Sequence, residues 1–374
     1  MILFFANNRK SAKYFGKVCS VLPVRCRLHR DQWFAKPDLS ALLHPPMEAV
    51  DAALEIMERQ NRILSGKALP RWKRWLLVSR AVWCFAIDKA LIQRVQPQMV
   101  VVWNGLMFRR SMFVAAAKSL GVKVCHMENG LLPNTTVCDS LGVNARNSMP
   151  REPFFYRECC RDLESESGKE KKVALVVRGA KVAKQSSGKP LPQRFLFVPF
   201  QVDTDSQLIL FSPWVKTMKE FFALMREARQ QCGLPLVFKE HPSSSISYSA
   251  LHGELDEGEG IFANEYPTQE LIEKAEAVVT INSSVGIEAL LLGKKVIVLG
   301  EAFFSIPGLV LPASNREELC CRLQEVLSWQ PDENLRKNFL SYLRHQYLIE
   351  GSWREASHAH CEAVSRRLVE FSRG

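Results

Sequence analysis

The sequence has no Cys-x-x-Cys pair and no spacing of cysteine and histidine that would suit a zinc ion. Its 11 cysteines are scattered along the chain, and only Cys159–Cys160 and Cys320–Cys321 are adjacent. Stable disulfides belong mainly to oxidising compartments. The cysteine pattern therefore favours a protein of the reducing cytosol.

An uninterrupted apolar run long enough to cross a bilayer is also missing. The longest mostly apolar stretch, 75–92, contains Arg80 and Asp88, and the apolar start at 1–5 has no small-residue cleavage site after it. We expect a first strand there, not a signal peptide. The basic segment Arg71–Trp75 would let the helix that follows rest on an anionic membrane surface. An ordinary amphipathic helix packed on a sheet is the favoured interpretation.

The size and composition predict a folded protein of two domains. The chain has 374 residues, of which 47% are hydrophobic, and its mean hydropathy is near zero. Lysine and arginine number 50 against 39 acidic residues, which gives a net charge of +11. This excess favours anionic partners, such as nucleotides, acidic sugars or phospholipid head groups. A nucleic acid is not expected, because the basic residues form no aromatic-interleaved patch.

Apolar and polar patterns alternate in both halves of the chain. In the first half they predict strands at 2–5, 99–103 and 122–125 and helices at 11–22, 47–62, 75–94 and 110–120. In the second half they predict strands at 195–199, 236–239, 277–280 and 295–299 and helices at 213–231, 268–274 and 286–292. Such alternation is typical of parallel sheets covered by helices on both faces.

The halves are separated by a stretch rich in charge, glycine and serine. We predict an N-terminal Rossmann-like domain at 1–165, a linker at 166–193 and a C-terminal Rossmann-like domain at 194–332. Helices at 333–374 are expected to pack back on the first domain.

A polar stretch from His126 to Pro150 follows the predicted strand 122–125 and is dense in turn-forming residues. We expect a loop at the carboxyl end of a strand, where α/β folds place their chemistry. Glu128 and Asp139 lie in it and are candidates for acid/base or nucleophilic work, although acids in loops are more often simply solvated.

Polar groups also follow two strands of the second half. Lys239, Glu240, His241 and Pro242 end the strand 236–239, where the cations can oppose a phosphate charge, or can be an ordinary surface turn.

Asn282, Ser283 and Ser284 stand where a helix begins, which predicts either an anion site or a plain helix cap. Glu288, on the first turn of that helix, would receive ribose hydroxyls or offset the helix dipole.

The segment Val198–Gln207 supplies a third polar group. Gln201, Asp203, Asp205, Ser206 and Gln207 are expected to lie on the side of the second domain that faces the first. The two aspartates make a metal site conceivable, but such spacings are frequent by chance, and no metal is predicted.

Four blocks resemble one family, in the family's order. They are ENGLLPNTTVCDSLGVNARNSMPREPFFY, VPFQVDTDSQ, KEHP and VVTINSSVGIEALLLGKKVIVLGEAFF, and they cover much of 125–307. All four are similar to segments of the bacterial capsule-synthesis β-Kdo glycosyltransferases. The resemblance implies a GT-B-like α/β fold with two Rossmann-like domains facing across a cleft. It also implies transfer of Kdo from CMP-Kdo with retention of configuration and without a metal or other cofactor.

The resemblance also implies roles for single residues. Asp139 matches the nucleophile, and Glu128 matches the acid before Asn129 and is assigned as general base or acid. His241 is the third catalytic residue and would hold the CMP phosphate together with Lys239. The remaining matches are to substrate-binding positions: Lys239, Pro242, Asn282, Ser283, Ser284, Glu288, Gln201, Asp205, Ser206 and Gln207 on the CMP side, with Asn129, Asn144 and Arg146 for the sugar. The chain departs from the family at Leu131–Leu132–Pro133, where relatives often carry Arg–Pro.

The favoured hypothesis is a cytoplasmic β-Kdo transferase of capsule or lipopolysaccharide synthesis, with a saccharide or lipid-linked acceptor, which could also bind the inner-membrane surface peripherally. Two alternatives stay open. One is transfer of another CMP-activated acidic sugar, such as a sialic acid. The other is a non-catalytic sugar-nucleotide or glycan-binding subunit of a capsule assembly complex.

Overall fold

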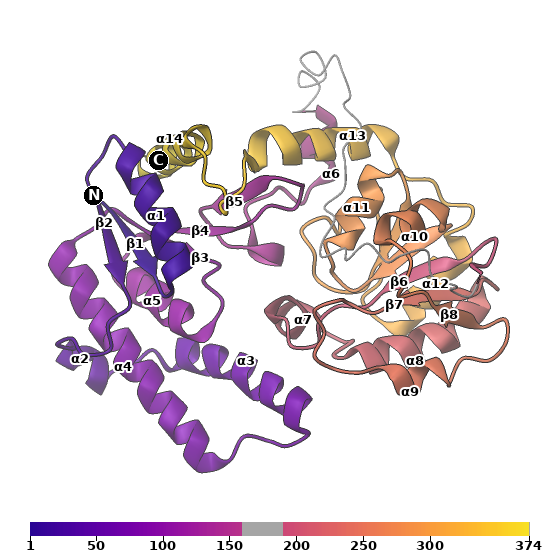
Figure 1. The fold of residues 1–374 in the computed structure, drawn as a ribbon, viewed down its shortest axis with the longest axis horizontal. Helices are drawn as coiled ribbons and strands as arrows, with labels where there is room; N and C mark the ends of the chain where they lie inside the picture. The colour runs from indigo at the N-terminus through magenta and orange to yellow at the C-terminus, as the bar shows by residue number, and fades with distance from the viewer. Residues whose placement is uncertain (159–189, 374) are drawn as a thin grey trace. The chain divides into compact units, whose positions relative to one another are not determined.

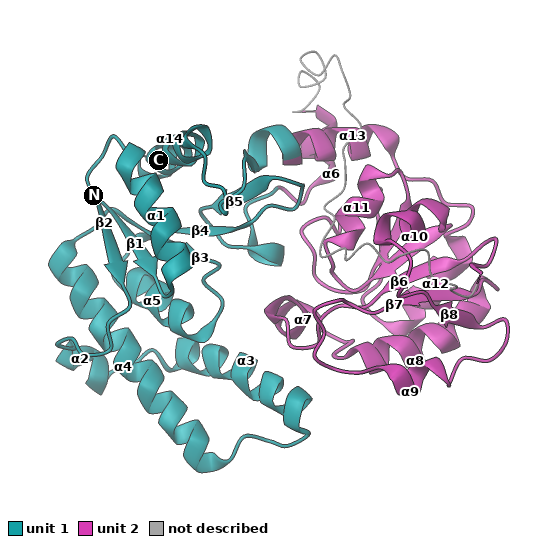
Figure 2. Ribbon diagram, in the orientation of Figure 1, with its two compact units in different colours: residues 1–149, 344–374 teal, residues 150–343 magenta. Residues whose placement is uncertain are grey.

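A computed structural model describes residues 1–158 and 190–373. The chain forms two compact units (Figure 2). Unit 1 consists of Met1–Met149 with Arg344–Gly374, and unit 2 is Pro150–Leu343. Each unit contains a six-stranded, mainly parallel sheet with helices packed on it, so the α/β prediction is confirmed.

The units do not begin and end where the domains were predicted. Helix α6 (Pro153–Glu158) packs against α13 (Glu333–Tyr342) inside unit 2, so the predicted boundary at 165 is too late. The chain returns to unit 1 at Arg344 and not at 333. Aromatic contacts between α6 and α13 explain both differences, because the ring of Tyr156 lies 5.3 Å from that of Phe339. The predicted linker lies, up to residue 189, outside the described residues.

The sheet of unit 1 has the order β12-β5-β4-β3-β1-β2. Its parallel strands are β1 (Ile2–Ala6), β2 (Cys26–Arg30), β3 (Met99–Trp103) and β4 (Lys123–Asn129), with β5 (Thr135–Asp139) antiparallel to β4 and β12 (Ile349–Glu350) antiparallel to β5. Helices α1 (Arg9–Val21) and α14 (His358–Arg373) share one apolar cluster with it, and α2 (Leu39–Leu43), α3 (Met47–Ser65), α4 (Arg71–Val95) and α5 (Phe108–Ser119) share another (Figure 1). The sheet is therefore covered on both faces.

The stretch 126–150 is not the single loop that its composition predicted. β4 continues to Asn129, and 135–139 returns as β5, so Glu128 and Asp139 are strand residues of one hairpin. At the turn, the backbone of Gly130 approaches Thr135 so closely that a Cβ there would lie 1.8 Å from the Thr135 Oγ1. The turn-forming residues predicted the hairpin turn correctly. The strands on either side were missed because they contain the polar residues His126 and Thr136, which are buried.

Helix α4 packs on the sheet only in its second part. Residues 71–76 are all exposed, and burial begins at Ala81. The favoured interpretation of an amphipathic helix packed on a sheet is therefore wrong for the first turns of α4.

Unit 2 has an all-parallel sheet in the order β11-β10-β9-β6-β7-β8. The strands are β6 (Leu196–Pro199), β7 (Leu236–Lys239), β8 (Gly260–Phe262), β9 (Ala277–Thr280), β10 (Lys295–Val298) and β11 (Leu311–Pro312). The helices of this unit, beside α6 and α13, are α7 (Ser206–Phe211), α8 (Met218–Ala228), α9 (Ser249–His252), α10 (Thr268–Lys274), α11 (Val285–Leu291) and α12 (Arg316–Glu325). All four strands predicted for the second half are present, and β8 and β11 were missed because they are only three and two residues long.

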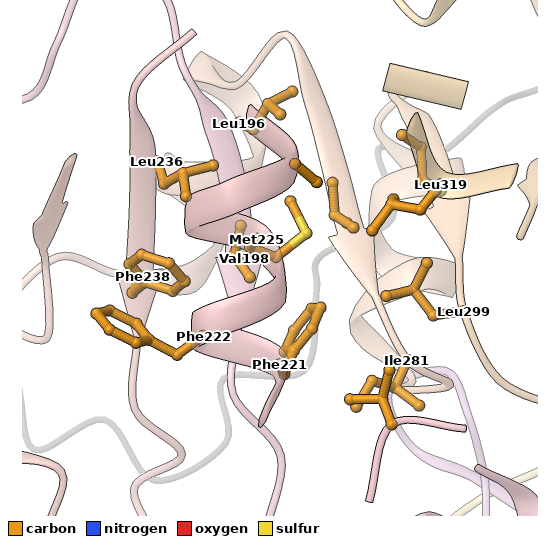
Figure 3. Close-up of a cluster of buried hydrophobic side chains, with 14 of the residues drawn as sticks. Leu196, Val198, Phe221, Phe222, Met225, Leu236, Phe238, Ile281, Leu299 and Leu319 are labelled. Carbon is orange, nitrogen blue, oxygen red and sulfur yellow. The ribbon is translucent and has the colours of Figure 1, made fainter. Parts of the chain in front are cut away.

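Helix α8 closes the core of unit 2 (Figure 3). Thr217 caps it by accepting a hydrogen bond from the backbone N–H of Glu220, and Met218, Phe221, Phe222 and Met225 recur at helical spacing and are buried. Burying each phenylalanine contributes about 2 to 3 kcal/mol of stability. Helix α8 therefore stabilises the sheet through the core of unit 2, and the polar loops lie at the carboxyl edge of the sheet.

Candidate active site

The strand order of unit 2 creates a switch point at its carboxyl edge. β6 is the first strand of the unit, and the chain builds outward from it in both directions, to β7 and β8 on one side and to β9 on the other. Open parallel sheets bind ligands outside the carboxyl ends of the strands at such a point. Most of the residues predicted to bind the donor lie in the loop 200–205 and the first turn of α7, which follow β6, and in the loop 281–284, which follows β9.

Gln201 and Asn282 join these two loops directly. The Gln201 Nε2 donates to the Asn282 Oδ1 at 2.9 Å, and the Asn282 backbone N–H donates to the Gln201 Oε1 at 3.1 Å. Asn282 is fully buried, and its Nδ2 donates to the carbonyls of Gln207 and Phe211. The structure therefore assigns Gln201 and Asn282 to holding the edge together and not to touching a ligand.

The loop after β6 is fixed by helix caps. Asp205 caps α7 by accepting from the backbone N–H of Gln207, and the Gln207 side chain donates to the carbonyl of Asn282. Ser206 is buried. Asp203 accepts hydrogen bonds from the backbone N–H of Met218 and from the hydroxyl of Tyr248, and burial raises its pKa. Both aspartates are thus occupied by protein donors.

Lys239 lies at the end of β7, but its ammonium group makes hydrogen bonds within unit 2. The Nζ donates to the carbonyls of Asn264 and Tyr266 at 2.6 and 2.7 Å. Burial lowers its pKa, and the charge of Glu265 opposes that shift. The predicted phosphate contact by Lys239 does not fit this arrangement, because the ammonium already holds the loop 264–266.

His241 is better placed for chemistry. It is half-buried, and its Nδ1 accepts a hydrogen bond from the backbone N–H of Ser243 at 3.1 Å. An imidazole whose Nδ1 accepts carries its proton on Nε2 when it is neutral. The loop therefore fixes the tautomer, and the exposed Pro242 follows at the turn.

Ser283 and Ser284 precede α11 as predicted. The Ser283 Oγ accepts from the backbone N–H of Val285 at 3.2 Å, whereas the Ser284 side chain makes no capping hydrogen bond. Both serines are half-buried, and Glu288 is buried. Ser284 and His241 are half-buried residues on the donor side, and their polar side chains can hydrogen-bond to a ligand.

In unit 1 the corresponding edge carries Glu128. β3 and β4 are parallel neighbours, and Asn104 follows β3 while Glu128 is near the end of β4. The Asn104 Nδ2 donates to the Glu128 Oε2 at 2.6 Å, and the backbone N–H and Nδ2 of Asn129 donate to Oε1 at 2.8 and 2.9 Å. The carboxylate is therefore held in one orientation while it stays partly exposed.

The charge of Glu128 also reaches Arg110. Burial lowers the pKa of Arg110, and the Glu128 carboxylate opposes this shift. Asn129 is held in turn by Trp353, whose Nε1 donates to the Asn129 Oδ1 at 2.7 Å. The sequence did not identify Asn104 or Trp353 as parts of this site. Asn104 precedes Gly105, a pair that is typical of a turn, and its φ of +64° marks a constrained position.

Asp139 has the opposite surroundings. It has no exposed surface, its Oδ1 accepts from the backbone N–H groups of Leu141 and Gly142, and its Oδ2 accepts from both the N–H and the hydroxyl of Ser148. Burial and the Asp139 charge raise the pKa of Tyr347 well above its ordinary value. A carboxylate that is completely buried beneath its own loop has no surface open to a substrate, and this does not fit the predicted role of nucleophile.

Asn144 and Arg146 lie on the loop that Asp139 folds. They form a 3₁₀ turn, Asn144–Arg146, in which Asn144 has a φ of +56° and Arg146 is exposed. Asp139 binds the chain on both sides of this turn, at Leu141 and at Ser148. Asp139 thereby positions the two side chains that were predicted to meet the sugar.

A family model described as "Capsule polysaccharide biosynthesis protein" matches residues 161–353. The chain belongs to this capsule polysaccharide biosynthesis family. The matched segment includes the carboxyl edge of unit 2, and Glu128 and Asp139 lie outside it. Within the residues that the structure describes, none of the helices of this family member is long and apolar enough to span a membrane.

Two curated proteins are similar to the chain. Protein FixF of Sinorhizobium fredii is 41% identical over 303 residues, which cover 79% of this chain and 72% of FixF. The capsule polysaccharide export protein KpsS of Escherichia coli is 26% identical over 292 residues, which cover 61% of this chain and 72% of KpsS.

Solved structures are similar at low identity. KpsC of Thermosulfurimonas dismutans, a "beta Kdo 2,7 transferase", matches with a TM-score of 0.45 and 18% identity over 81% of this chain and 97% of that one. The UDP-GlcNAc 2-epimerase of Methanocaldococcus jannaschii matches with a TM-score of 0.39 and 11% identity over 99% and 100%.

Proposed function

We propose that this chain is a glycosyltransferase that transfers Kdo from CMP-Kdo to a saccharide or lipid-linked acceptor, with retention of configuration, in capsule or lipopolysaccharide synthesis. Membership of the capsule polysaccharide biosynthesis family supports the pathway. The four sequence blocks that resemble β-Kdo transferases support the donor.

The observation that carries the reaction is the orientation of Glu128. Three donors, on Asn104 and Asn129, fix both of its oxygens at the carboxyl edge of a parallel sheet. In our proposal one oxygen attacks the anomeric carbon of Kdo, and the bond from that carbon to the phosphate of CMP breaks. The oxygen of the acceptor hydroxyl then attacks the same carbon, the bond from that carbon to Glu128 breaks, and the hydroxyl proton passes to the released Glu128 carboxylate. Two inversions give net retention.

Unit 2 supplies the donor-binding side of the proposal. The Nε2–H of His241 donates to an oxygen of the leaving phosphate, because Ser243 holds the proton on that nitrogen. Ser284 adds a hydroxyl at the start of α11. Gln201 and Asn282 keep the two loops at the switch point together. Arg146 pairs with the carboxylate of Kdo, which a guanidinium matches in shape. The proposal requires no metal, since CMP leaves as a monophosphate.

The test is intact-protein mass spectrometry after incubation with CMP-Kdo generated in place. We expect wild type to gain the mass of one Kdo residue and the Glu128→Gln variant to gain none. Fragment-ion sequencing of the labelled peptide then separates the two carboxylates, which trypsin leaves on one peptide because no lysine or arginine lies between them.

An adduct located on Asp139 itself would overturn the role of Glu128 and leave the donor assignment standing. CMP-sialic acid in place of CMP-Kdo is the matched donor control. Adduct or CMP release with that donor alone would overturn the assignment of Kdo. Neither donor reacting with any acceptor mixture would favour the glycan-binding subunit.

A further inference from the structure

The loop between α3 and α4, with the turns on either side of it, presents large apolar side chains to solvent. In this α3–α4 tip, defined as residues 62–76, Leu64 is 61% exposed, Trp72 62%, Trp75 67% and Leu76 50%. Figure 1 places it at the end of unit 1 that lies away from the strands. Two tryptophans at such exposure are unusual for a surface with no function, because an indole loses much free energy by staying in water.

The apolar side chains form a stripe along α4. Trp72, Trp75 and Leu76 are followed at helical spacing by Trp83, which is 36% exposed. The stripe begins in residues 71–76, which are all exposed, whereas α4 first packs on the core at Leu77 and Val78. A helix that extends beyond the core of its own domain and exposes aromatic side chains is suited to binding another molecule or a membrane.

The charge of the tip indicates which kind of partner it binds. From Arg59 to Arg80 the sequence contains seven basic residues and no acidic one. Five of them, Arg62, Lys67, Arg71, Lys73 and Arg74, fall within the tip itself. The Lys73 ammonium lies 5.4 Å from the ring centre of Trp72. The tip is therefore a basic patch interleaved with tryptophan, contrary to the interpretation of the sequence, and this composition binds the interface of an anionic bilayer.

Contacts with α3 hold the tip in shape. The guanidinium of Arg74 pairs with Asp51 and with Glu58 on α3 at 2.9 and 2.8 Å. Gly66 ends α3 in the left-handed conformation, with a φ of +68°. Because α3 is anchored by buried residues such as Val50 and Leu54, the first turns of α4 are fixed before any partner binds.

We propose that the α3–α4 tip docks this protein on an anionic lipid bilayer, with Trp72, Trp75 and Leu76 at the level of the head groups and the lysines and arginines paired with lipid phosphates. The surface is a docking site and not a membrane span. The proposal does not depend on the proposed transferase activity, because binding is measured without donor or acceptor.

The experiment is co-sedimentation of the full chain with vesicles of phosphatidylcholine alone or with one third phosphatidylglycerol. We expect binding to the anionic vesicles, weakened at high salt, and at least tenfold weaker binding to the neutral ones. The triple variants Trp72→Ser/Trp75→Ser/Leu76→Ser and Lys67→Gln/Arg71→Gln/Lys73→Gln should each bind the anionic vesicles at least tenfold more weakly.

Two control variants change charge or an exposed aromatic side chain outside the tip. Lys219→Gln/Lys337→Gln/Arg366→Gln loses the same charge from exposed positions, and Phe154→Ser removes a side chain that is 69% exposed. Both should bind as wild type does. Thermal unfolding of every variant separates lost docking from lost folding, and brominated lipids should quench tryptophan fluorescence in wild type but much less in the tryptophan variant.

Three results would overturn the proposal. The first is wild-type binding by folded tip variants, and the second is equal loss of binding in the charge control. The third is an absence of vesicle binding by wild type. In that last case, a dimer that the tryptophan variant loses would identify a second copy of the chain as the occupant, and tip-dependent binding of an oligonucleotide would identify a nucleic acid.

Discussion

Glu128 and Asp139 belong to one β-hairpin and yet have opposite surroundings. Across the hairpin Asp139 pairs with His126, whereas Glu128 pairs with Val137. Asp139 is therefore two residues, or about 7 Å, further from the turn than Glu128. That distance separates a partly exposed carboxylate at the sheet edge from one that lies completely under its own loop. The position of an acid along a strand, more than its neighbours in sequence, decides whether it can reach a substrate.

The largest effect should come from Glu128→Gln. We expect transfer from CMP-Kdo to fall by about a thousandfold or more, because an amide does not act as the nucleophile. The thermal unfolding midpoint should change little, since Glu128 is partly exposed and water can satisfy the donor that the new amide nitrogen displaces. Initial rates of CMP release, with a melting curve for each protein, check both statements. If the Glu128→Gln variant kept its activity, Glu128 would not be the nucleophile.

Asp139→Asn should act on stability instead. The new amide nitrogen would face backbone N–H groups or the Ser148 donors, and we expect a loss of about 3 kcal/mol in the free energy of unfolding. Urea denaturation measures it. Ser148→Ala is the matched control, expected to cost about 1 kcal/mol because it removes only the hydroxyl contact. If Asp139→Asn were as stable as wild type and inactive, Asp139 would have a role in the reaction after all.

Asn104→Ala tests whether the orientation of Glu128 matters. Without the 2.6 Å hydrogen bond from Asn104 we expect kcat to fall about tenfold with little change in KM for the donor. The acid limb of the pH–rate profile should move to higher pH, because a donor that stabilises the charged carboxylate is lost. Asn104→Asp is not an equivalent change, since it places a second charge beside Glu128. An unshifted pH profile would make Asn104 a purely structural residue.

The smallest effect concerns buried histidines. Burial lowers the pKa of His126, beside Asp139 in the sheet, and lowers that of His29 to about 4. The folded state therefore prefers the neutral rings, and the unfolded state binds more protons as the pH falls. The stabilisation is complete above about pH 6.5 and is lost between there and about pH 4. For His29, which is partly exposed, we expect about 1 kcal/mol between pH 7 and pH 5. A flatter stability profile in His29→Gln checks this contribution.

Much of the fold could be predicted from the sequence because its signals are local. Continuous apolar runs mark buried parallel strands, and the predicted 99–103, 236–239 and 277–280 agree with the structure at both ends. The hairpin of β4 and β5 could not be found in this way. Its strands contain buried polar side chains, such as His126 and Thr136, whose burial depends on helices and strands far away in the chain.

The site was predictable as a set of loops but not as a set of roles. The polar residues after β6, β7 and β9 were located correctly, since carboxyl ends of parallel strands share one edge. Their partners were not visible. Asn282 bonds to Gln201, 81 residues away, and Lys239 bonds to carbonyls 25 and 27 residues further on. A hydrogen bond across such a separation leaves no local pattern.

By itself the sequence determined the α/β alternation, the positions of the polar loops, the family resemblance and the basic, tryptophan-containing segment at 71–75. Only the tertiary structure decided which of these polar and aromatic groups stay accessible. It buried Asp139 and left Glu128 at an edge, and it placed Trp72 and Trp75 beyond the core on which α4 otherwise packs. The physical reason is that residue type and spacing fix local conformation, whereas burial and hydrogen-bond partners depend on segments that meet only when the chain has folded.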